Sequence, residues 1–409
     1  MSFFQSVLGL LFFLSIPFIL SANKKNVSWR FVGIGVLSQF ILAFVFLKVP
    51  PITEILVQLN KIVSVLQSST DKASQFMLGY IAGGPTPFLV SNPENNFIVA
   101  FRILPLILVI SALSALLFHF GILTRVVSGF AFLLQRFFKI SGALGFGSAA
   151  SVFLGTIETP LIIRPYLAKL SRAELLALIT CSMSTVAGTV IFLYASVLEK
   201  SLPNALTHLL VASIISVPAA LTVSHLFLPT SDSTDSHFEL EKSQSTWAEV
   251  LLNSIHEALQ MIFSIVAIII VLFAFIHIID SSLGIIDPSI SVASILSQLL
   301  RPVTWLLGYS WDKSAVVAEL FGTKIVLNEF VSYLKLAELE ILTQSEKLVA
   351  AYALCGFANF ASAGIIIAGL TSMLPDRRSD VISLTLWALL FGNISTLITG
   401  CIINILSVI

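Results

Sequence analysis

Residues 262–279, "IFSIVAIIIVLFAFIHII", form a long apolar run that limits the folds open to this chain. A helix needs about 20 mostly apolar residues to cross the hydrocarbon core of a bilayer, and this run is long enough to do so. Only 11% of the residues are charged and 57% are hydrophobic, whereas soluble domains average about 25% charged residues. We therefore expect an all-α polytopic membrane protein with about eight transmembrane helices. The other predicted spans are 3–22, 31–49, 103–124, 175–198, 205–228, 349–372 and 381–406.

The charge and cysteine content exclude several functions. The formal net charge is zero and no basic stripe is present, so we expect no nucleic-acid partner. Cys181, Cys355 and Cys401 all lie in apolar segments without metal-ligand spacing. We interpret them as small packing residues and expect no bound cofactor.

Lysine and arginine in the short loops indicate the orientation in the membrane. Lys24, Lys25 and Arg30 follow the first span, which predicts that this loop is cytoplasmic and that the N-terminus lies outside. Counting spans forward puts the acidic tract around Glu239 inside and the C-terminus outside. The same count puts the other basic positions in the cytoplasm, namely Arg125, Arg136, Lys139, Lys169, Arg172, Arg377 and Arg378.

Two regions must enter and leave the membrane on the same face for this count to work. They run from about 126 to 170 and from about 289 to 337, and the second is bounded by Pro288 and Lys335. Each contains two apolar pieces that are short for full spans, joined by a tip, "GALGFGSAASVFLG" in the first and "AELFGTKIVLNE" in the second. Interrupted backbone at membrane depth is tolerated where protein or a water-filled cavity satisfies it. We predict two re-entrant hairpins.

The two hairpins belong to a repeated pattern of hairpin, broken span and span. It occurs at 126–228 and again, from the opposite face, at 289–406. Paired interrupted segments in two inverted halves point to a transporter's binding site near the middle of the membrane. We expect four parts: 1–125 and 247–284 as scaffold, the latter also as oligomer contact, and 126–228 and 285–409 as transport repeats. The stretch 50–97 is amphipathic, which favours an interfacial helix.

Two glutamates lie in the hairpins, Glu158 in the first and Glu329 in the second. A carboxylate at membrane depth costs about 2.5–3.5 kcal/mol on insertion scales, which favours a functional role. Gly155 and Pro160 interrupt the helix beside Glu158 and free backbone groups to meet ions or polar solute.

Structural roles are the alternative for these polar residues. Glu158 has a possible ion-pair partner in Arg164, and Glu329 has one in Lys324. Asn359 and Ser362 lie in a predicted span, where such side chains commonly form hydrogen bonds between helices.

Five segments carry a resemblance to a known family. They are "SANKKNVSWR", "LKVPP", "FLGTIETPLIIRPYL" (153–167), "GTKIVLNEFVSYLKL" (322–336) and "GFANFASAGI" (356–365). The chain resembles the concentrative nucleoside transporter family, as a bacterial member, over essentially its whole length. The resemblance implies a homotrimer in the inner membrane, with eight spans, two opposed hairpins and an interfacial helix in each protomer. It also implies cation-driven nucleoside import by an elevator-like movement.

The resemblance assigns substrate contacts residue by residue. Glu329, Asn359 and Ser362, with Phe357 beside them, match the positions that hold the ribose in the family. Val190 matches an apolar position that packs against the base. In the first hairpin the family usually has Gly-Gln-Thr-Glu facing the base. Here the glycine is followed by Thr156, Ile157 and Glu158, so the amide is missing.

The resemblance also assigns a sodium site. Ser151 matches the asparagine ligand at the first hairpin's tip, and the other ligands match the Leu154 backbone, the Thr185 hydroxyl and the Val186 backbone. The serine side chain is shorter than that of asparagine and reaches less far toward a bound ion. Glu158 and Glu329, the two carboxylates that could take up a proton, are both retained. The coupling ion is therefore sodium or a proton, and the changed ligand favours the proton.

Rival functions can be separated by experiment. A membrane-embedded enzyme using Glu158 and Glu329 predicts substrate conversion by purified protein rather than uptake by vesicles, and a channel predicts flux without accumulation. A secondary transporter of another polar solute is the principal alternative.

Overall fold

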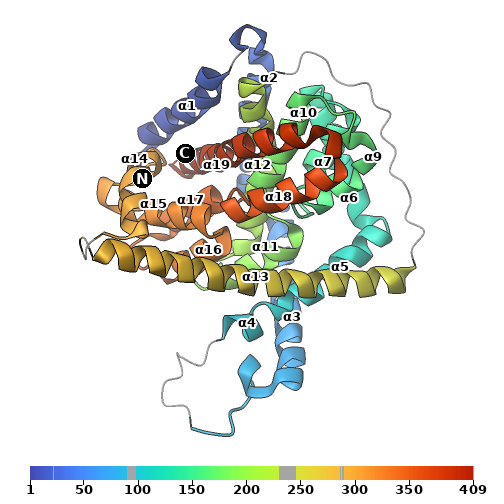
Figure 1. The fold of residues 1–409 in the computed structure, drawn as a ribbon, viewed down its shortest axis with the longest axis vertical. Helices are drawn as coiled ribbons and strands as arrows, with labels where there is room; N and C mark the ends of the chain where they lie inside the picture. The colour runs from blue at the N-terminus through green and yellow to red at the C-terminus, as the bar shows by residue number, and fades with distance from the viewer. Residues whose placement is uncertain (22, 90–97, 230–245, 286, 288–289, 409) are drawn as a thin grey trace.

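The computed structural model describes residues 1–409 apart from 22, 90–97, 230–245, 286, 288–289 and 409. Every regular element of the described residues is a helix, and Figure 1 shows a helical body from which α3 (Pro50–Leu78) and α4 (Val99–Arg102) project. The other α-helices are α1 (Phe3–Leu20), α2 (Trp29–Lys48), α5 (Pro105–His119), α6 (Ile122–Phe138), α7 (Gly142–Ala150), α8 (Glu158–Ile162), α9 (Arg164–Leu167), α10 (Arg172–Ser184), α11 (Gly188–Leu198), α12 (Ala205–Phe227), α13 (Trp247–Gly284), α14 (Val292–Trp305), α15 (Trp311–Val326), α16 (Glu329–Glu338), α17 (Gln344–Leu354), α18 (Phe360–Met373) and α19 (Arg378–Val408).

Seven stretches in the described part of the chain are helical, apolar and long enough to cross a bilayer. They are 3–20, 29–48, 99–119, 172–198, 205–227, 247–284 and 375–408, and each overlaps a predicted span. The predicted span 349–372 coincides with α17 and α18, which a break at 355–359 separates. The prediction of an all-helical polytopic membrane protein is confirmed.

Several spans begin at a capping box, in which a serine or threonine and a glutamate three residues later satisfy each other's backbone N–H groups. Such boxes fix where α10, α13 and α17 start, and all three helices begin before the predicted apolar windows. The pairs are Ser171 with Glu174, Thr246 with Glu249, and Thr343 with Glu346.

The hairpins differ from prediction in where the chain turns. The small-residue stretch 142–150 forms α7, and 318–326 forms the end of α15, so the breaks are confined to 151–157 and 327–328. Small residues serve here for close helix packing rather than for turning. A Cβ on Gly145 would lie 2.6 Å from Cγ of Gln135 in α6, and one on Gly147 would lie 2.6 Å from Cδ1 of Leu178 in α10.

Both predicted hairpin regions contain more helices than the two pieces expected: α6 to α9 in the first and α14 to α16 in the second. In the first region α6 precedes α7 and packs against it, and in the second α14 precedes α15 and does the same. The order of breaks nevertheless repeats: α7 to α12 and α15 to α19 each contain an interrupted hairpin, an interrupted span and an unbroken span. Re-entry into the membrane and the four-part division stay predictions, and the boundary at 125–126 falls inside α6.

The buried core lies around α10, α11, α12 and α19. In the apolar windows of the spans 172–198 and 205–227, 89% and 83% of the residues are buried, whereas none is buried in the window of α13. Figure 1 shows α13 running along one edge of the body, with α3 projecting past it. α3 is not among the candidate spans, and its position at the membrane interface stays a prediction.

Some sequence features fall outside the described residues. These are the acidic tract around Glu239, Pro288, and the 90–97 end of the predicted interfacial stretch.

Candidate functional site

Glu329 opens α16 immediately after the break in the second hairpin. Asn328 is the N-cap, and its Oδ1 accepts a hydrogen bond from Val331 N at 3.0 Å. This cap starts a new helix at the point where α15 has ended, which puts Glu329 in the first helical turn. Only 3% of Glu329 is exposed, so its carboxylate depends on protein partners. The positive end of the α16 dipole favours a negative charge at this position.

Both carboxylate oxygens of Glu329 are hydrogen-bonded. Tyr194 Oη donates to Oε1 at 2.6 Å, and Asn359 Nδ2 donates to Oε2 at 3.0 Å. Asn359 is the N-cap of α18, and its Oδ1 accepts from Ser362 N at 2.8 Å. The structure therefore brings together Glu329, Asn359 and Ser362, which the family resemblance assigns to one site, and adds Tyr194.

Lys324 forms no salt bridge with Glu329 in the described part of the chain, although the two charges attract each other. Its side chain is fully buried, and Nζ donates to the Ala353 carbonyl at 3.3 Å and to Thr396 Oγ1 at 3.0 Å. The lysine thus ties the end of α15 to α17 and α19 just before the break at 355–359.

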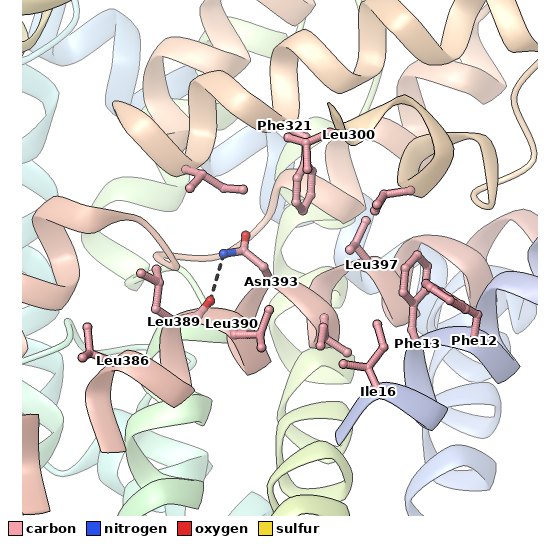
Figure 2. Close-up of a pocket in the computed structure, with 13 residues that line it drawn as sticks. Phe12, Phe13, Ile16, Leu300, Phe321, Leu386, Leu389, Leu390, Asn393 and Leu397 are labelled. Atoms are coloured by element: carbon pink, nitrogen blue, oxygen red, sulfur yellow. Dashed lines mark hydrogen bonds between the residues drawn. The ribbon is translucent and has the colours of Figure 1, made fainter. Parts of the chain in front are cut away.

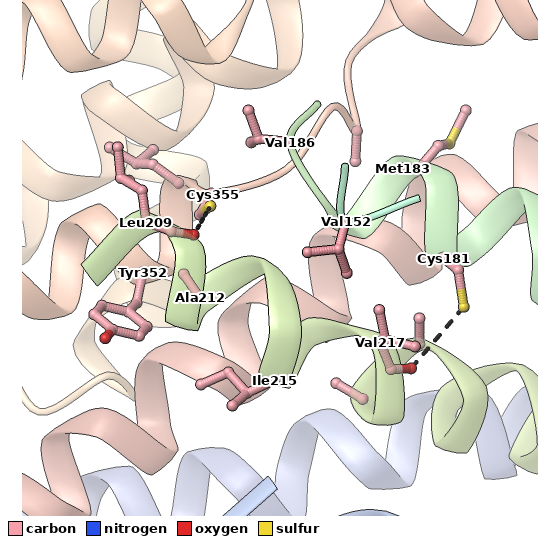
Figure 3. Close-up of a cluster of buried hydrophobic side chains, with 14 of the residues drawn as sticks. Val152, Cys181, Met183, Val186, Leu209, Ala212, Ile215, Val217, Tyr352 and Cys355 are labelled. Atoms are coloured by element: carbon pink, nitrogen blue, oxygen red, sulfur yellow. Dashed lines mark hydrogen bonds between the residues drawn. The ribbon is translucent and has the colours of Figure 1, made fainter. Parts of the chain in front are cut away.

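The breaks of the two interrupted spans lie against each other. Phe357 N donates to the Thr185 carbonyl at 3.2 Å, which joins the 355–359 break to the 185–187 break. A Cβ on Gly356 would lie 2.9 Å from the Met183 carbonyl oxygen and 3.0 Å from that of Ser184. Glycine is needed here because the two backbones approach too closely for a side chain. Figure 3 shows residues beside both breaks, including Val186 and Cys355, near α12.

Residues of the first hairpin form a second group. Glu158 is half-buried, and its Oε2 accepts from Gly155 N at 2.8 Å. It forms no ion pair with Arg164 in the described part of the chain. Ile157 packs against α18, because a Cβ on Gly369 would lie 3.3 Å from Ile157 Cδ1.

The two carboxylates remain separate. Glu158 and Glu329 share no hydrogen-bond partner among the described residues. Thr156 is half-buried between Gly155 and Ile157, and Val190 is buried one turn before Tyr194 on α11. Side chains four residues apart share a helix face, so Val190 and Tyr194 lie on the same side of α11.

Of the predicted cation ligands, Thr185 in the 185–187 break contacts the backbone of Ser151 in the first hairpin's tip. Thr185 Oγ1 lies 2.8 Å from the Ser151 carbonyl and 3.0 Å from the Cys181 carbonyl. Ser151 Oγ donates to the Ser148 carbonyl at 2.8 Å, and Val186 N donates to Ser213 Oγ at 3.3 Å. Leu154 follows in the same tip, with its N–H on the Ala150 carbonyl at 2.8 Å.

The oxygen atoms of Ser151, Thr185 and Leu154 are suitable ligands for a hard cation. Hydroxyl and carbonyl oxygens are ligands for hard ions rather than for zinc or copper. Across the described residues no group of three or more histidine, cysteine, aspartate or glutamate side chains could hold a metal. Thr185 meets the backbone carbonyl of Ser151, whereas the Ser151 hydroxyl, which is the predicted ligand, is bonded to the Ser148 carbonyl. The cation site stays a prediction.

A cavity of about 320 Å³ lies elsewhere, between α1, α14, α15 and α19 (Figure 2). Its wall is apolar apart from Asn393, and it includes none of the predicted substrate or cation residues. Asn393 Nδ2 donates to the Ala358 carbonyl at 3.0 Å and so satisfies a backbone group of the 355–359 break from the side of the cavity. The cavity is therefore adjacent to the candidate site through this one side chain.

Sequence reasoning missed Tyr194. It stands in the apolar stretch "GTVIFLYASVL", where an aromatic residue normally indicates packing alone. Its spacing of four residues from Val190 was the available signal.

Three family models match consecutive parts of the chain. The model described as the N-terminus of Na+ dependent nucleoside transporters matches residues 8–81, and that for their C-terminus matches 208–404. A third model, described as nucleoside recognition, matches 100–201.

Known proteins match over nearly the whole chain. Solute carrier family 28 member 3 of Eptatretus stoutii is 32% identical over 97% of this chain and 60% of its own length. Sodium/nucleoside cotransporter 1 of Homo sapiens is 30% identical over 98% of this chain and 63% of its own length. An uncharacterized transporter of Haemophilus influenzae is 30% identical, over 98% of this chain and 97% of its own. The chain thus spans about three fifths of the length of the animal relatives.

Solved structures agree with this fold. CNTnw in an inward-facing substrate-bound state is 28% identical, with a TM-score of 0.90 and 98% of both chains covered. A doubly substituted CNTnw in an outward-facing state is 27% identical, with a TM-score of 0.92, covering 100% of this chain and 98% of its own.

Proposed function

Because the chain belongs to the Na+ dependent nucleoside transporter family, we propose that it imports nucleosides across a bacterial plasma membrane, driven by a coupled cation. The observation that carries the proposal is the buried Glu329 carboxylate, held by Tyr194 and Asn359 where helices of two interrupted segments begin. A carboxylate at membrane depth is costly to retain, so its position favours binding a polar solute. The family is one of transporters, which argues against an embedded enzyme that uses Glu158 and Glu329.

The ribose is the part of a nucleoside that Glu329 suits. Ribose hydroxyls are hydrogen-bond donors, and bonds to a carboxylate are roughly twice as strong as neutral ones. Asn359 and Ser362 at the start of α18 add polar groups to the same site, and Phe357 lies in the adjoining break. In this proposal Val190, Thr156, Ile157 and Glu158 face the base.

The coupling cation is proposed to act at the tip of the first hairpin. The contact between Thr185 Oγ1 and the Ser151 carbonyl supports a site shared by the tip and the break. We favour a proton over sodium, because Ser151 replaces a longer ligand while Glu158 and Glu329 are both present. The family model's description favours sodium, and uptake with one gradient at a time decides between the two ions.

Transport is proposed to proceed by an elevator-type movement. The repeats 126–228 and 285–409 would move as a unit against the scaffold, 1–125 and 247–284. Solved states of CNTnw that are inward-facing, intermediate and outward-facing support alternating access in a relative. α13 has no buried residue in its apolar window, which supports its role as the contact in a homotrimer. Both chain termini are proposed to lie outside the cytoplasm.

Uptake into proteoliposomes tests the function and the ion together. The purified chain is reconstituted, and accumulation of labelled uridine is followed with only a proton gradient or only a sodium gradient imposed. Accumulation driven by protons alone is expected. Accumulation driven by sodium and insensitive to protons would contradict the proton assignment and make Ser151 a working ligand.

A panel of competing solutes separates this proposal from the principal alternative. Nucleosides should compete for uridine uptake, and free nucleobases should compete poorly because they lack the sugar. If no nucleoside is taken up or competes while another polar solute is accumulated, the chain is a carrier of that solute instead.

A further inference from the structure

Tyr194 makes the shortest contact to Glu329. Its Oη lies 2.6 Å from Glu329 Oε1, within the 2.5–2.7 Å typical of a hydroxyl that donates to a carboxylate. Only 4% of Tyr194 is exposed. A buried hydrogen bond to a charged group is strong, and leaving one partner unpaired is costly.

The ring of Tyr194 is held in place by the hairpin that carries Glu329. Its centroid lies 5.9 Å from that of Phe330 and 5.2 Å from that of Tyr333, in α16. Tyr194 itself belongs to α11, in the first repeat. The hydroxyl is therefore fixed by packing before any solute binds, and it joins the interrupted span of one repeat to the hairpin of the other.

Tyr194 and Asn359 together define how the carboxylate meets a ligand. Each holds one oxygen, Tyr194 the Oε1 atom and Asn359 the Oε2 atom. A carboxylate has about four lone-pair positions, so the bonds from Tyr194, Asn359 and the Glu329 backbone N–H still leave a position for a further donor. Two acceptors side by side match the two neighbouring hydroxyls of a ribose.

We propose that Tyr194 is a positioning residue that fixes the Glu329 carboxylate for the 2′,3′-diol of a ribonucleoside. This inference rests on the proposed function and adds a determinant of sugar specificity to it. Without the phenol, Glu329 is held on one oxygen only, and its carboxylate can rotate away from the diol.

Binding of two ligands to two matched variants tests the proposal. Tyr194→Phe removes only the hydroxyl and keeps the ring packing. Tyr333→Phe is the control, because Tyr333 is also buried and touches Tyr194, but its Oη donates to the Ala351 carbonyl at 3.0 Å. Calorimetry on purified protein gives Kd for uridine and for 2′,3′-dideoxyuridine, which lacks both hydroxyls.

The expected result is a selective loss. For Tyr194→Phe the uridine Kd should rise about 10- to 100-fold, the range for losing a hydrogen bond to a charged group, while the dideoxyuridine Kd stays near wild type. Tyr333→Phe should keep the wild-type ratio of the two Kd values. If Tyr194→Phe does not fold, Tyr194→Met, which also lacks a donor, should show the same loss of discrimination.

Other outcomes would overturn the proposal. An equal loss for both ligands would indicate a purely structural role for Tyr194. Tighter uridine binding would mean that the phenol competes with the sugar. A wild-type protein that binds both ligands alike would refute the ribose assignment of Glu329 itself, whereas wild-type discrimination that survives Tyr194→Phe would refute only the role of Tyr194.

Discussion

Replacing Glu329 with alanine would remove the acceptor for two buried donors at once. Tyr194 Oη and Asn359 Nδ2 both donate to this carboxylate, and an unsatisfied buried group costs about 1–3 kcal/mol. The fold should therefore lose roughly 2–6 kcal/mol, less whatever water entering the space restores. Nucleoside binding should suffer separately, because each hydrogen bond to a charged group contributes about 1.5–3 kcal/mol. We expect uridine affinity to fall roughly 10- to 100-fold or more.

The assay pairs binding with thermal unfolding and uses a control in the same hairpin. Uridine Kd and Tm are measured for Glu329→Ala and for Glu319→Ala. Glu319 pairs with Lys335 at 3.0 Å, but the two side chains are 42% and 40% exposed. An exposed ion pair contributes about 0–1 kcal/mol, so Glu319→Ala should change neither quantity much.

Two outcomes would contradict the role of Glu329 in binding. If Glu329→Ala reaches the membrane folded and binds uridine with wild-type affinity, Glu329 does not hold the substrate. An equal loss of affinity in Glu319→Ala would instead indicate a general disturbance of the hairpin.

The remaining predictions concern the close approach of the breaks, the cation and the base. Gly356→Ala should lower Tm by the equivalent of about 1–3 kcal/mol, because its Cβ would meet the Met183 and Ser184 carbonyls. The control Gly364→Ala should be tolerated, because a Cβ there has nothing within 4 Å. Equal Tm values for the two variants would contradict the geometry. Ser151→Asn should restore reach toward a cation beside Thr185 and make uridine uptake more dependent on sodium, as measured with one gradient at a time; an unchanged ion dependence would exclude Ser151 from the cation site. Thr156→Gln should shift competition toward pyrimidine nucleosides by returning an amide to the base; a panel in which wild type already excludes adenosine and inosine would show this interpretation of the tip to be wrong.

Much of the fold could be predicted from the sequence because apolar length and helix-breaking residues act locally. The spans followed from windows of about 20 apolar residues, and the break before Glu158 contains Gly155, as predicted. The prediction that Pro160 interrupts the helix was wrong, because Pro160 lies in the first turn of α8, where a proline removes no hydrogen bond of the helix. Asn328 and Asn359 are N-caps, which is why the polar residues after them fall in first helical turns.

Two features depend on packing between distant parts of the chain and could not be predicted from local sequence. The small residues 142–150 predict a turn when seen alone, yet they form α7 because α6 and α10 approach it closely at Gly145 and Gly147. Tyr194 joins the site through a contact 135 residues away in the chain. The spacing from Val190 indicates the face of α11 on which Tyr194 lies, but it does not specify Glu329 as the partner.

The hydrogen bond from Phe357 N to the Thr185 carbonyl has a thermodynamic consequence. Thr185 belongs to the proposed cation site and Phe357 to the proposed nucleoside site, so a ligand that orders one break orders the backbone of the other. The two binding events then share a coupling free energy, and such coupling is reciprocal. The factor by which the cation tightens nucleoside binding must equal the factor by which the nucleoside tightens cation binding. Titration of either ligand at fixed concentrations of the other measures the same coupling factor.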